Sequence, residues 1–458
     1  MRGSAVSRRV AVWLFAVGLA LRLVHLLTVR DSALFNLLYI DPKLYDEWGL
    51  AIAGGRLLGE APFFLDPLYP YVIGAIYAVT GRSLVAVAVV QVVLGACVAP
   101  LTYDAARRWF DPAVAGLAGA VAVVYPPSIY YSVVLLKPGI AIFLVALALW
   151  LLARALGDGR TPAWLATGFA FGLTVLMRTN LLLVVPLIAL AVALERGAGG
   201  DSAGRGLAGW RAAVALAAGC LTALLPATVH NLAAGGEPIL ATTNWGQIFY
   251  IGNNEHNPTG RFEELPFVRS NPAFEQIDFK NEAERRAGRE LSHGATSRFW
   301  FGEALDWTLA HPAAWAGLQW SKLRIYWGGY ETPASLDYNL YSRHAPLLGL
   351  HLPGFGLLGP FGLLGAVLAL GRPGWPRLLA LWVGAGSLSV VAFFVLTRFR
   401  MVVVPALYVL AAAAVVELWR AYRRPADEHG WVRPLWLTTL LLVFFAFVNL
   451  PVRATADS

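Results

Sequence analysis

Three carboxylates stand close together in a chain that otherwise carries few charges. They are Asp41, Asp46 and Glu47, in the stretch from Tyr39 to Trp48. The chain as a whole is 58% hydrophobic and only 14% charged. A carboxylate can take a proton from an attacking hydroxyl group, so each of the three is a candidate general base. We therefore predict that Asp41, Asp46 and Glu47 are the catalytic residues.

A second set of residues suited to chemistry consists of cations at the ends of apolar runs: Lys137, Arg178, Arg398 and Arg400. The positive-inside rule disfavours cations on the outer face, where we place these four. Snorkelling to lipid headgroups would explain any one of them. Four on the same face favour the binding of an anionic group, such as a lipid-linked phosphate, through charge-assisted hydrogen bonds.

The elements that must position these residues are membrane helices. A bilayer core is crossed by roughly 20 apolar residues. Six apolar runs approach or reach that length: Val10 to Val29, Leu84 to Ala105, Ile140 to Leu156, Ala212 to Leu232, Leu381 to Leu396 and Leu435 to Leu450. This pattern excludes a soluble domain with one core and predicts an all-α integral membrane protein. The net charge of +8 comes from scattered arginines without a basic stripe, so no nucleic-acid partner is expected.

The distribution of Lys and Arg predicts the topology. Pro67 to Thr80 is short for a span. If it lies at the outer surface instead, the pairs Arg8-Arg9 and Arg107-Arg108 both fall on the cytoplasmic side. We then expect about eleven transmembrane helices in the cytoplasmic membrane, with a cytoplasmic N-terminus, an extracytoplasmic C-terminus and an extracytoplasmic active site.

This topology divides the chain into five parts. They are a first transmembrane helix (1–29), an extracytoplasmic catalytic loop with surface helices (30–82), a transmembrane core (83–232), a second extracytoplasmic loop (233–346) and C-terminal transmembrane helices (347–458). In the second loop, His311 to Gly328 is rich in Trp with Lys322 and Arg324 interleaved, which suits an interfacial helix.

A proton acceptor and phosphate-binding cations on one face are the two halves of a glycosyl transfer. The carboxylate deprotonates an acceptor hydroxyl as it attacks the anomeric carbon, and the cations stabilise the departing phosphate. Neither GxxxxGK[ST] nor a GxGxxG between strand and helix is present, so a nucleotide-sugar donor on the cytoplasmic side is not expected. No His/Cys/Asp cluster has metal-ligand spacing; we assign no metal site, and a divalent metal is not supported.

Several short motifs make the chain resemble the polytopic GT-C glycosyltransferases. Among these it is most similar to the bacterial relatives of protein O-mannosyltransferases and lipid A aminoarabinose transferases. The motifs are Tyr39-Ile40-Asp41 with Tyr45, Pro67-Leu68-Tyr69-Pro70, Tyr130-Tyr131 through Leu136-Lys137, Ile251-Gly252-Asn253-Asn254 to Gly260, and Arg398-Phe399-Arg400 before Pro405. In order and topology the resemblance covers nearly the whole chain.

The resemblance implies a GT-C fold, a polyprenyl-phosphate sugar as donor and inversion at the anomeric carbon. It makes Asp41 the base, with Asp46 and Glu47 as second candidates. The substrate-binding residues expected with it are Tyr45, Tyr69, Lys137, Arg178, Asn253, Asn254, Arg398 and Arg400. Membrane lipids and an acceptor protein, lipid or glycan are the further partners.

Two positions depart from the family patterns. The Lys-Pro-Pro-Leu-Tyr sequence of the aminoarabinose transferases is here Leu65-Asp66-Pro67-Leu68-Tyr69, so the acid Asp66 lies near the position of a family cation. Lys137 lies near the place where oligosaccharyltransferases have paired acids. The second departure puts a bound divalent metal in doubt.

Other interpretations remain open from the sequence. A polymerase or ligase of lipid-linked glycans would rest on Arg and His of the second loop, and a transporter would carry charges in the middle of broken spans. For Asn253 and Asn254, turn formation competes with the binding of sugar or acceptor hydroxyls.

Overall fold

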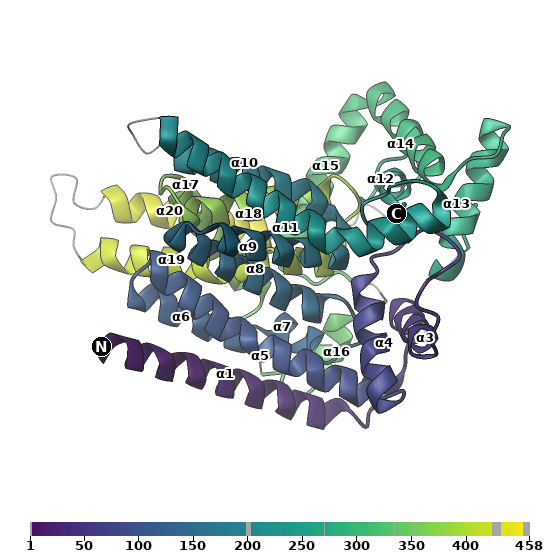
Figure 1. Cartoon of the computed structure of the whole chain (residues 1–458). Coiled ribbons are helices and arrows are strands. Elements are labelled where there is room, and N and C mark those ends of the chain that lie inside the picture. Colours follow the sequence, from purple (N-terminus) through teal and green to yellow (C-terminus); the bar gives the residue numbers. More distant parts are fainter. Residues whose placement is uncertain are drawn as a thin grey trace.

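The computed structural model describes residues 2–197, 203–269, 271–333, 335–350, 353–423 and 432–451. Within these ranges every regular element is a helix, which confirms the predicted all-α class. Figure 1 shows two parts: long helices lie side by side in a bundle, and shorter helices gather at one end of it. We call the end that carries α3, α4 and α12 to α15 the loop end.

The bundle consists of the apolar helices. Its members are α1 (Arg2–Val29), α5 (Leu84–Trp109), α6 (Pro112–Val124), α8 (Pro138–Asp158), α9 (Thr161–Met177), α10 (Val184–Gly197), α11 (Ala203–Gly235), α17 (Phe355–Leu370), α18 (Trp375–Val391), α19 (Val404–Arg423) and α20 (Val432–Asn449). Among the described residues, six helices are long and apolar enough to cross a membrane: α1, α5, α8, α11, α19 and α20. The chain is thus a multi-pass membrane protein. Because the other bundle helices have 13 to 17 residues, the predicted number of about eleven spans stays a prediction.

Glycines set the closest approach within the bundle, between α9 and α11. A Cβ atom on Gly168 would lie 1.8 Å from the backbone oxygen of Leu216, and one on Gly219 would lie 2.1 Å from that of Leu165. Small residues allow such close packing of membrane helices. The pair therefore holds the end of α9, where Arg178 follows, in a fixed place.

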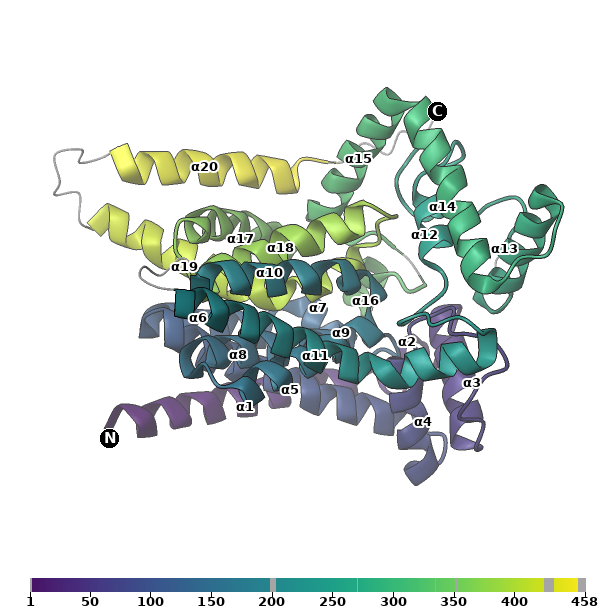
Figure 2. The same ribbon diagram turned by 45° about the horizontal axis from the view of Figure 1, so that its top comes forward.

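The loop end is built from helices of the two long loops. They are α2 (Ala33–Asn36), α3 (Asp41–Ala53), α4 (Leu68–Thr80), α12 (Trp245–Gly252), α13 (Pro272–Ala287), α14 (His293–Ala310), α15 (Pro312–Trp327) and α16 (Tyr338–His344). Three short helical turns, α7 (Pro126–Tyr131), η1 (Thr179–Leu183) and η2 (Thr397–Val402), connect bundle helices. Figures 1 and 2 show α12 to α15 standing beyond the bundle, and in Figure 1 α4 runs across its end. That placement agrees with a surface helix over Pro67 to Thr80.

Candidate active site at the loop end of the bundle

The predicted base and one predicted phosphate-binding cation form an ion pair. Asp41 is the first residue of α3, and Arg398 lies in η2. A guanidinium nitrogen of Arg398 lies 2.6 Å from Oδ2 of Asp41. The hydroxyl of Ser335 donates to the same carboxylate oxygen at 2.7 Å. The two charged side chains are 17% and 14% exposed, so the pair is shielded from solvent but open to it on one side.

The backbone before Asp41 is strained. Ile40 has φ +54° and ψ −113°, and it is the non-glycine residue with positive φ in the described ranges. Such a conformation costs on the order of 1–3 kcal/mol and persists only where the surrounding structure enforces it. Pro42 follows within the first turn of α3, where its fixed φ suits a helix start. The strain therefore sets the direction in which the Asp41 carboxylate leaves the helix.

Asp46 anchors α3 to its neighbours and is not a free base. The hydroxyl of Tyr77 donates to Asp46 at 2.6 Å, and Arg82 donates two hydrogen bonds to Oδ2 at 2.8 and 3.0 Å. Glu47 faces solvent, with a side chain 59% exposed and a loose pair to Lys43 at 3.8 Å. Of the three predicted catalytic carboxylates, the structure brings only Asp41 to the predicted cations.

The environment of Asp41 keeps it ionised. Burial by itself would raise the pKa of this carboxyl, but the charge of Arg398 and the hydrogen bonds from Ser335 and Arg398 outweigh burial, so the pKa lies below its usual value. Asp41 is therefore a carboxylate at neutral pH. While Arg398 holds it, it is a weak proton acceptor.

Asp66 and Lys137, the two departures from the family patterns, are partners. Lys137 Nζ lies 2.5 Å from Asp66 Oδ2. The other carboxylate oxygen accepts from the backbone N–H of Thr179 at 3.0 Å and from its hydroxyl at 2.6 Å. Burial would raise the pKa of Asp66, and Lys137 with Arg178 lowers it. The negative charge of Asp66 thus compensates the positive charge of Lys137.

Two buried tyrosines lie beside this pair. Lys137 Nζ lies 5.6 Å from the ring centre of Tyr45, and the edge of that ring meets Tyr69 at 5.2 Å between centroids. Tyr69 is fully buried, and its hydroxyl donates to Gln91 Oε1 at 2.8 Å. Tyr69 was predicted to bind substrate, but its burial leaves it a supporting position behind Tyr45.

Arg178 is a buried cation without a direct ion pair among the described residues, although the negative charge of Asp66 acts on it. It directly follows α9, is 7% exposed, and stacks over Phe399 at 4.3 Å from the ring centre. Its Nε has no hydrogen-bond partner, and no ion pair reaches its side chain from the described part of the chain. Phe399 is the neighbour of Arg398 in η2, so the two guanidinium groups approach one another from different elements.

Arg400 turns away from this cluster. Its side chain is fully buried and pairs with Glu331, while Nη1 donates to the backbone oxygens of Tyr326 at 3.1 Å and Gly328 at 2.6 Å. Residues two apart in a short helical turn point in different directions, which is why the Arg398-Phe399-Arg400 motif does not supply two cations to one site. In this structure Arg400 is a core ion pair, which corrects its predicted place.

Asn253 and Asn254 use their amide groups within the second loop. Asn253 donates to the backbone oxygens of Phe249 and Ala392, each at 2.9 Å, and its oxygen accepts from Lys322 Nζ at 2.9 Å. Asn254 donates to Tyr250 at 2.7 Å and accepts from the N–H of His256 at 2.6 Å. These bonds favour the turn-forming interpretation over the predicted contacts with a sugar.

Sequence reasoning missed three polar groups of the site: Ser335, Thr179 and Glu275. Glu275 lies on α13, and its Oε1 is buried without a hydrogen-bond partner. Burial, and then the charge of Asp41, raises the pKa of Glu275 to about 7. In the sequence Glu275 is one acid among several in a polar helix, so no local signal marks it. Within the described ranges, no group of three His, Cys, Asp or Glu side chains is placed to hold a metal ion.

One family model matches part of the chain. Residues 61–217 match the model described as dolichyl-phosphate-mannose-protein mannosyltransferase. The match covers about a third of the chain and includes Asp66, Lys137 and Arg178 but neither Asp41 nor Arg398. The matched segment agrees with the class that the motifs predict, a polytopic glycosyltransferase of the GT-C type. No curated protein sequence matches the chain.

Solved structures with a similar arrangement are also known. One is the archaeal oligosaccharyltransferase AglB from Archaeoglobus fulgidus in complex with an inhibitory peptide and a dolichol-phosphate, with 16% identity, a TM-score of 0.49, and coverage of 98% of this chain and 57% of that one. Another is ArnT from Cupriavidus metallidurans bound to undecaprenyl phosphate, with 14% identity, a TM-score of 0.49, and coverage of 95% and 69%. The chain thus spans little more than half the length of the oligosaccharyltransferase.

Proposed function

We propose that the protein moves a sugar from a polyprenyl-phosphate donor to an acceptor hydroxyl, with inversion at the anomeric carbon and Asp41 as general base. The observation that carries the proposal is the contact between Asp41 and Arg398, which places a proton acceptor beside a phosphate-binding cation. The matching family model supports the donor class, because its description names a lipid-phosphate sugar.

Arg178 is the residue best prepared to receive the donor phosphate. A buried cation without a direct ion pair is costly, and a phosphate placed between Arg178 and Arg398 removes that cost. Guanidinium groups bind phosphate oxygens through paired, charge-assisted hydrogen bonds. The stacking of Arg178 on Phe399 fixes the plane of its guanidinium before the ligand arrives.

Binding of the phosphate also activates the base. In the empty site Arg398 lowers the pKa of Asp41. A phosphate that attracts Arg398 weakens this ion pair, so the pKa of Asp41 rises and its oxygens become free for an acceptor hydroxyl. Proton acceptance by Asp41 thus depends on the presence of the donor.

The transfer step follows from these roles. The acceptor oxygen attacks the anomeric carbon from the side opposite the phosphate, the bond between that carbon and the phosphate oxygen breaks, and the acceptor proton passes to Asp41. The negative charge of the departing polyprenyl phosphate is stabilised by Arg178 and Arg398. Tyr45 is nearly as buried as Tyr69, so its role is to position Lys137 from behind.

We place this reaction at the outer face of the cytoplasmic membrane. The support is the distribution of charge: Arg8, Arg9, Arg107 and Arg108 lie on loops and helix ends that the positive-inside rule assigns to the cytoplasm. The two long loops, with Asp41 and Ser335, then lie outside. Cysteine labelling from the outside of intact cells at Ser292 and at Asp158 tests this orientation, with only the first position expected to react.

The function is tested with purified protein and polyprenyl-phosphate sugars. Asp41→Asn should lower transfer by roughly two to four orders of magnitude, the usual contribution of a general base, while undecaprenyl phosphate still binds. Glu47→Gln is the matched control, because Glu47 is an exposed carboxylate of the same helix and should transfer normally. Full activity of Asp41→Asn with normal expression would reject Asp41 as the base.

A further inference from the structure

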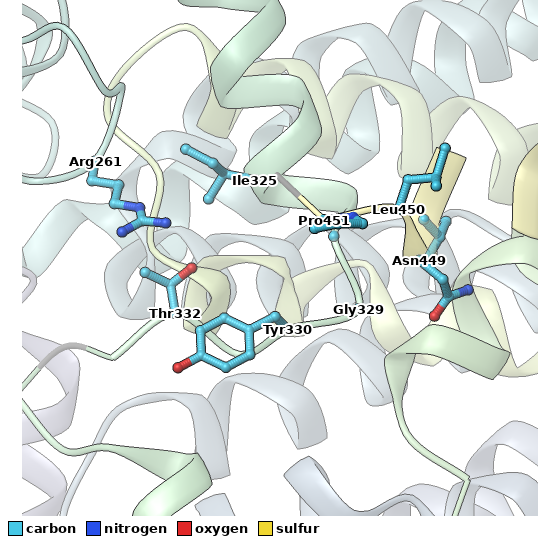
Figure 3. A pocket seen from close by; sticks show the side chains of 10 residues that line it. Arg261, Ile325, Gly329, Tyr330, Thr332, Asn449, Leu450 and Pro451 are labelled. Atoms are coloured by element: carbon cyan, nitrogen blue, oxygen red, sulfur yellow. The ribbon is translucent and has the colours of Figure 1, made fainter. Parts of the chain in front are cut away.

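A separate cavity lies between the end of α15 and the end of α20. Its volume is about 360 Å³, and the segment Gly328 to Thr332 forms one side of it. In Figure 3 Arg261, Thr332 and Tyr330 lie toward one end of the cavity, which we call the polar end, and Leu450, Pro451 and Asn449 lie toward the other. The second end is mainly apolar, because the Asn449 amide donates to the backbone oxygen of Gly356, and we call it the apolar end.

Among the described residues, the cation at the polar end forms no ion pair. Arg261 Nε is buried without a hydrogen bond, and no ion pair reaches the Arg261 side chain from the described residues. An arginine stays charged at any physiological pH. A partly buried guanidinium left without an anion is unfavourable, so this end of the cavity is suited to an anionic ligand.

The backbone holds Arg261 at the cavity. Asn257 Oδ1 accepts from the N–H of Gly260 at 2.7 Å, and Asn257 Nδ2 donates to the backbone oxygen of Arg261 at 2.8 Å. Gly260 has φ +82°, and a Cβ there would lie 2.5 Å from Cγ of Lys322 on α15. Glycine at this position thus lets the loop lie directly against α15. Ile325 of this helix lines the cavity.

The apolar end lies at the end of a candidate membrane span. Val448 lies in the last turn of α20, and Leu450, which directly follows the helix, is 58% exposed. On α15, the neighbouring Trp320 is also 58% exposed and packs its ring near Phe447 of α20. Exposed Trp and apolar residues at the end of a span are typical of the depth at which lipid headgroups lie.

We propose that this cavity binds the phosphate headgroup of a membrane lipid, at a site separate from that of the sugar donor. The phosphate contacts Arg261 and Thr332, and the lipid chains leave past Leu450 along α20. A phospholipid suits both ends of the cavity, because its phosphate is an anion for the guanidinium and its acyl chains are hydrocarbon for the apolar end. The proposal goes beyond the proposed function and does not rest on it.

Hydrogen bonds hold the segment from Gly328 to Thr332, which lies between the cavity and the Asp41 site. Arg400 donates to the backbone oxygen of Gly328, and the hydroxyl of Thr397 donates to that of Thr332 at 3.3 Å. Three residues after Thr332, Ser335 donates to Asp41. Because three residues span at most about 11 Å, a lipid in the cavity lies close to the Asp41 site without occupying it.

The test measures lipid binding to the full-length protein in detergent by native mass spectrometry. The probes are dioctanoyl phosphatidylglycerol and, without the phosphate, dioctanoyl glycerol. Wild type should bind the phosphatidylglycerol at least tenfold more tightly than Arg261→Gln does, roughly the loss expected for one charge-assisted contact. Arg289→Gln, an exposed arginine of the same loop, is the matched control and should bind like wild type.

Two further variants keep the test decisive if Arg261→Gln folds poorly. Arg261→Lys keeps the charge and should retain part of the affinity, and Thr332→Val keeps the side-chain shape but should weaken binding. Equal affinity of wild type and both Arg261 variants would overturn the proposal. Inorganic phosphate that binds as tightly as the lipid would overturn the lipid assignment, and an Arg261 dependence seen only with undecaprenyl phosphate would assign the cavity to the donor.

Discussion

The guanidinium carbon of Arg178 lies 4.3 Å from the ring centre of Phe399, which is the residue next to Arg398. The stacking contact joins the end of α9 to η2 and orients one cation beside the other. Cation–π contacts of desolvated arginines are worth about 2 kcal/mol, which is less than the several kcal/mol that burial of an unpaired cation costs. The empty site is therefore held in an unfavourable electrostatic state that an anion relieves.

Replacement of Arg178 by Met should separate stability from function. Met fills a similar volume without a charge, so the apparent Tm should rise by a few degrees, because removal of a buried unpaired charge is stabilising. The affinity for undecaprenyl phosphate should fall roughly tenfold or more, because a charge-assisted contact is lost. Both are measured on the purified protein, by thermal unfolding and by lipid binding. Arg160→Met, at an exposed position, should change neither, and a lower Tm for Arg178→Met would show that the charge of Asp66 stabilises Arg178 without a direct ion pair.

The pair of Asp66 and Lys137 should tolerate exchange better than disruption. Asp66→Asn leaves Lys137 without its ion-pair partner and removes a negative charge that acts on Arg178, and loss of one partner of a buried pair costs about 3–5 kcal/mol. The double variant Asp66→Lys with Lys137→Asp restores opposite charges and should regain part of that stability. Thermal unfolding of the three proteins checks this. If the double variant is as unstable as the sum of the single ones, the pair is not a self-contained unit.

Substitution of Arg400 should mainly lower stability, whereas substitution of Arg398, two residues away, should mainly lower lipid binding. Arg400→Ala leaves Glu331 buried and unpaired, so we expect a loss of about 3–5 kcal/mol and poor recovery of folded protein. Arg398→Ala should lose less stability, because the pair is more exposed than that of Arg400 and Ser335 still donates to Asp41, and it should bind undecaprenyl phosphate weakly. Glu331→Gln in the Arg400→Ala background should recover folded protein, as seen by size-exclusion chromatography. Normal folding of Arg400→Ala with weakened lipid binding would instead restore Arg400 to the site.

The raised pKa of Glu275 predicts a pH dependence of stability. Its pKa is about 7 in the folded protein and about 4.5 when unperturbed. Between these values the folded state retains a proton that the unfolded state has lost, so stability falls as pH rises from about 4.5 to 7 and is then constant. In Glu275→Gln this contribution disappears. Apparent Tm values at pH 5, 6, 7 and 8 should therefore decline less for the variant, and identical slopes would place Glu275 in a more polar environment.

Composition and hydrophobic periodicity were sufficient to predict the class of fold. Long apolar runs have few alternatives to membrane helices, so the helical bundle followed from them directly. Pro67 to Thr80 was predicted as a surface helix from the placement of Arg107 and Arg108, and α4 lies across the end of the bundle (Figure 1). The short bundle helices could not be counted with the same certainty, because 13 to 17 residues do not decide between a span and a partial one.

The site was predictable where a residue's role follows from its type and its place at a helix end. Asp41, Arg178, Arg398 and Lys137 all come together from distant segments, as the motif order indicated. What sequence could not resolve was the direction of side chains. Asp46 lies five residues after Asp41 and Arg400 two residues after Arg398, yet each side chain points into a structural pair. Glu275 and Ser335 were missed for the opposite reason, because the second loop brings them to Asp41 only through tertiary packing.

The conformation of Ile40 links catalytic competence to the docking of one short helix. Its positive φ is tolerated only while α3 is fastened by Asp46 to Tyr77 and Arg82. If these hydrogen bonds of Asp46 break, we expect Ile40 to leave its positive φ and the Asp41 side chain to change direction, while the helices of the bundle stay in place. We therefore expect heating, ageing or mild denaturant to lower transfer activity before the helices unfold, because the orientation of the Asp41 carboxylate is lost first.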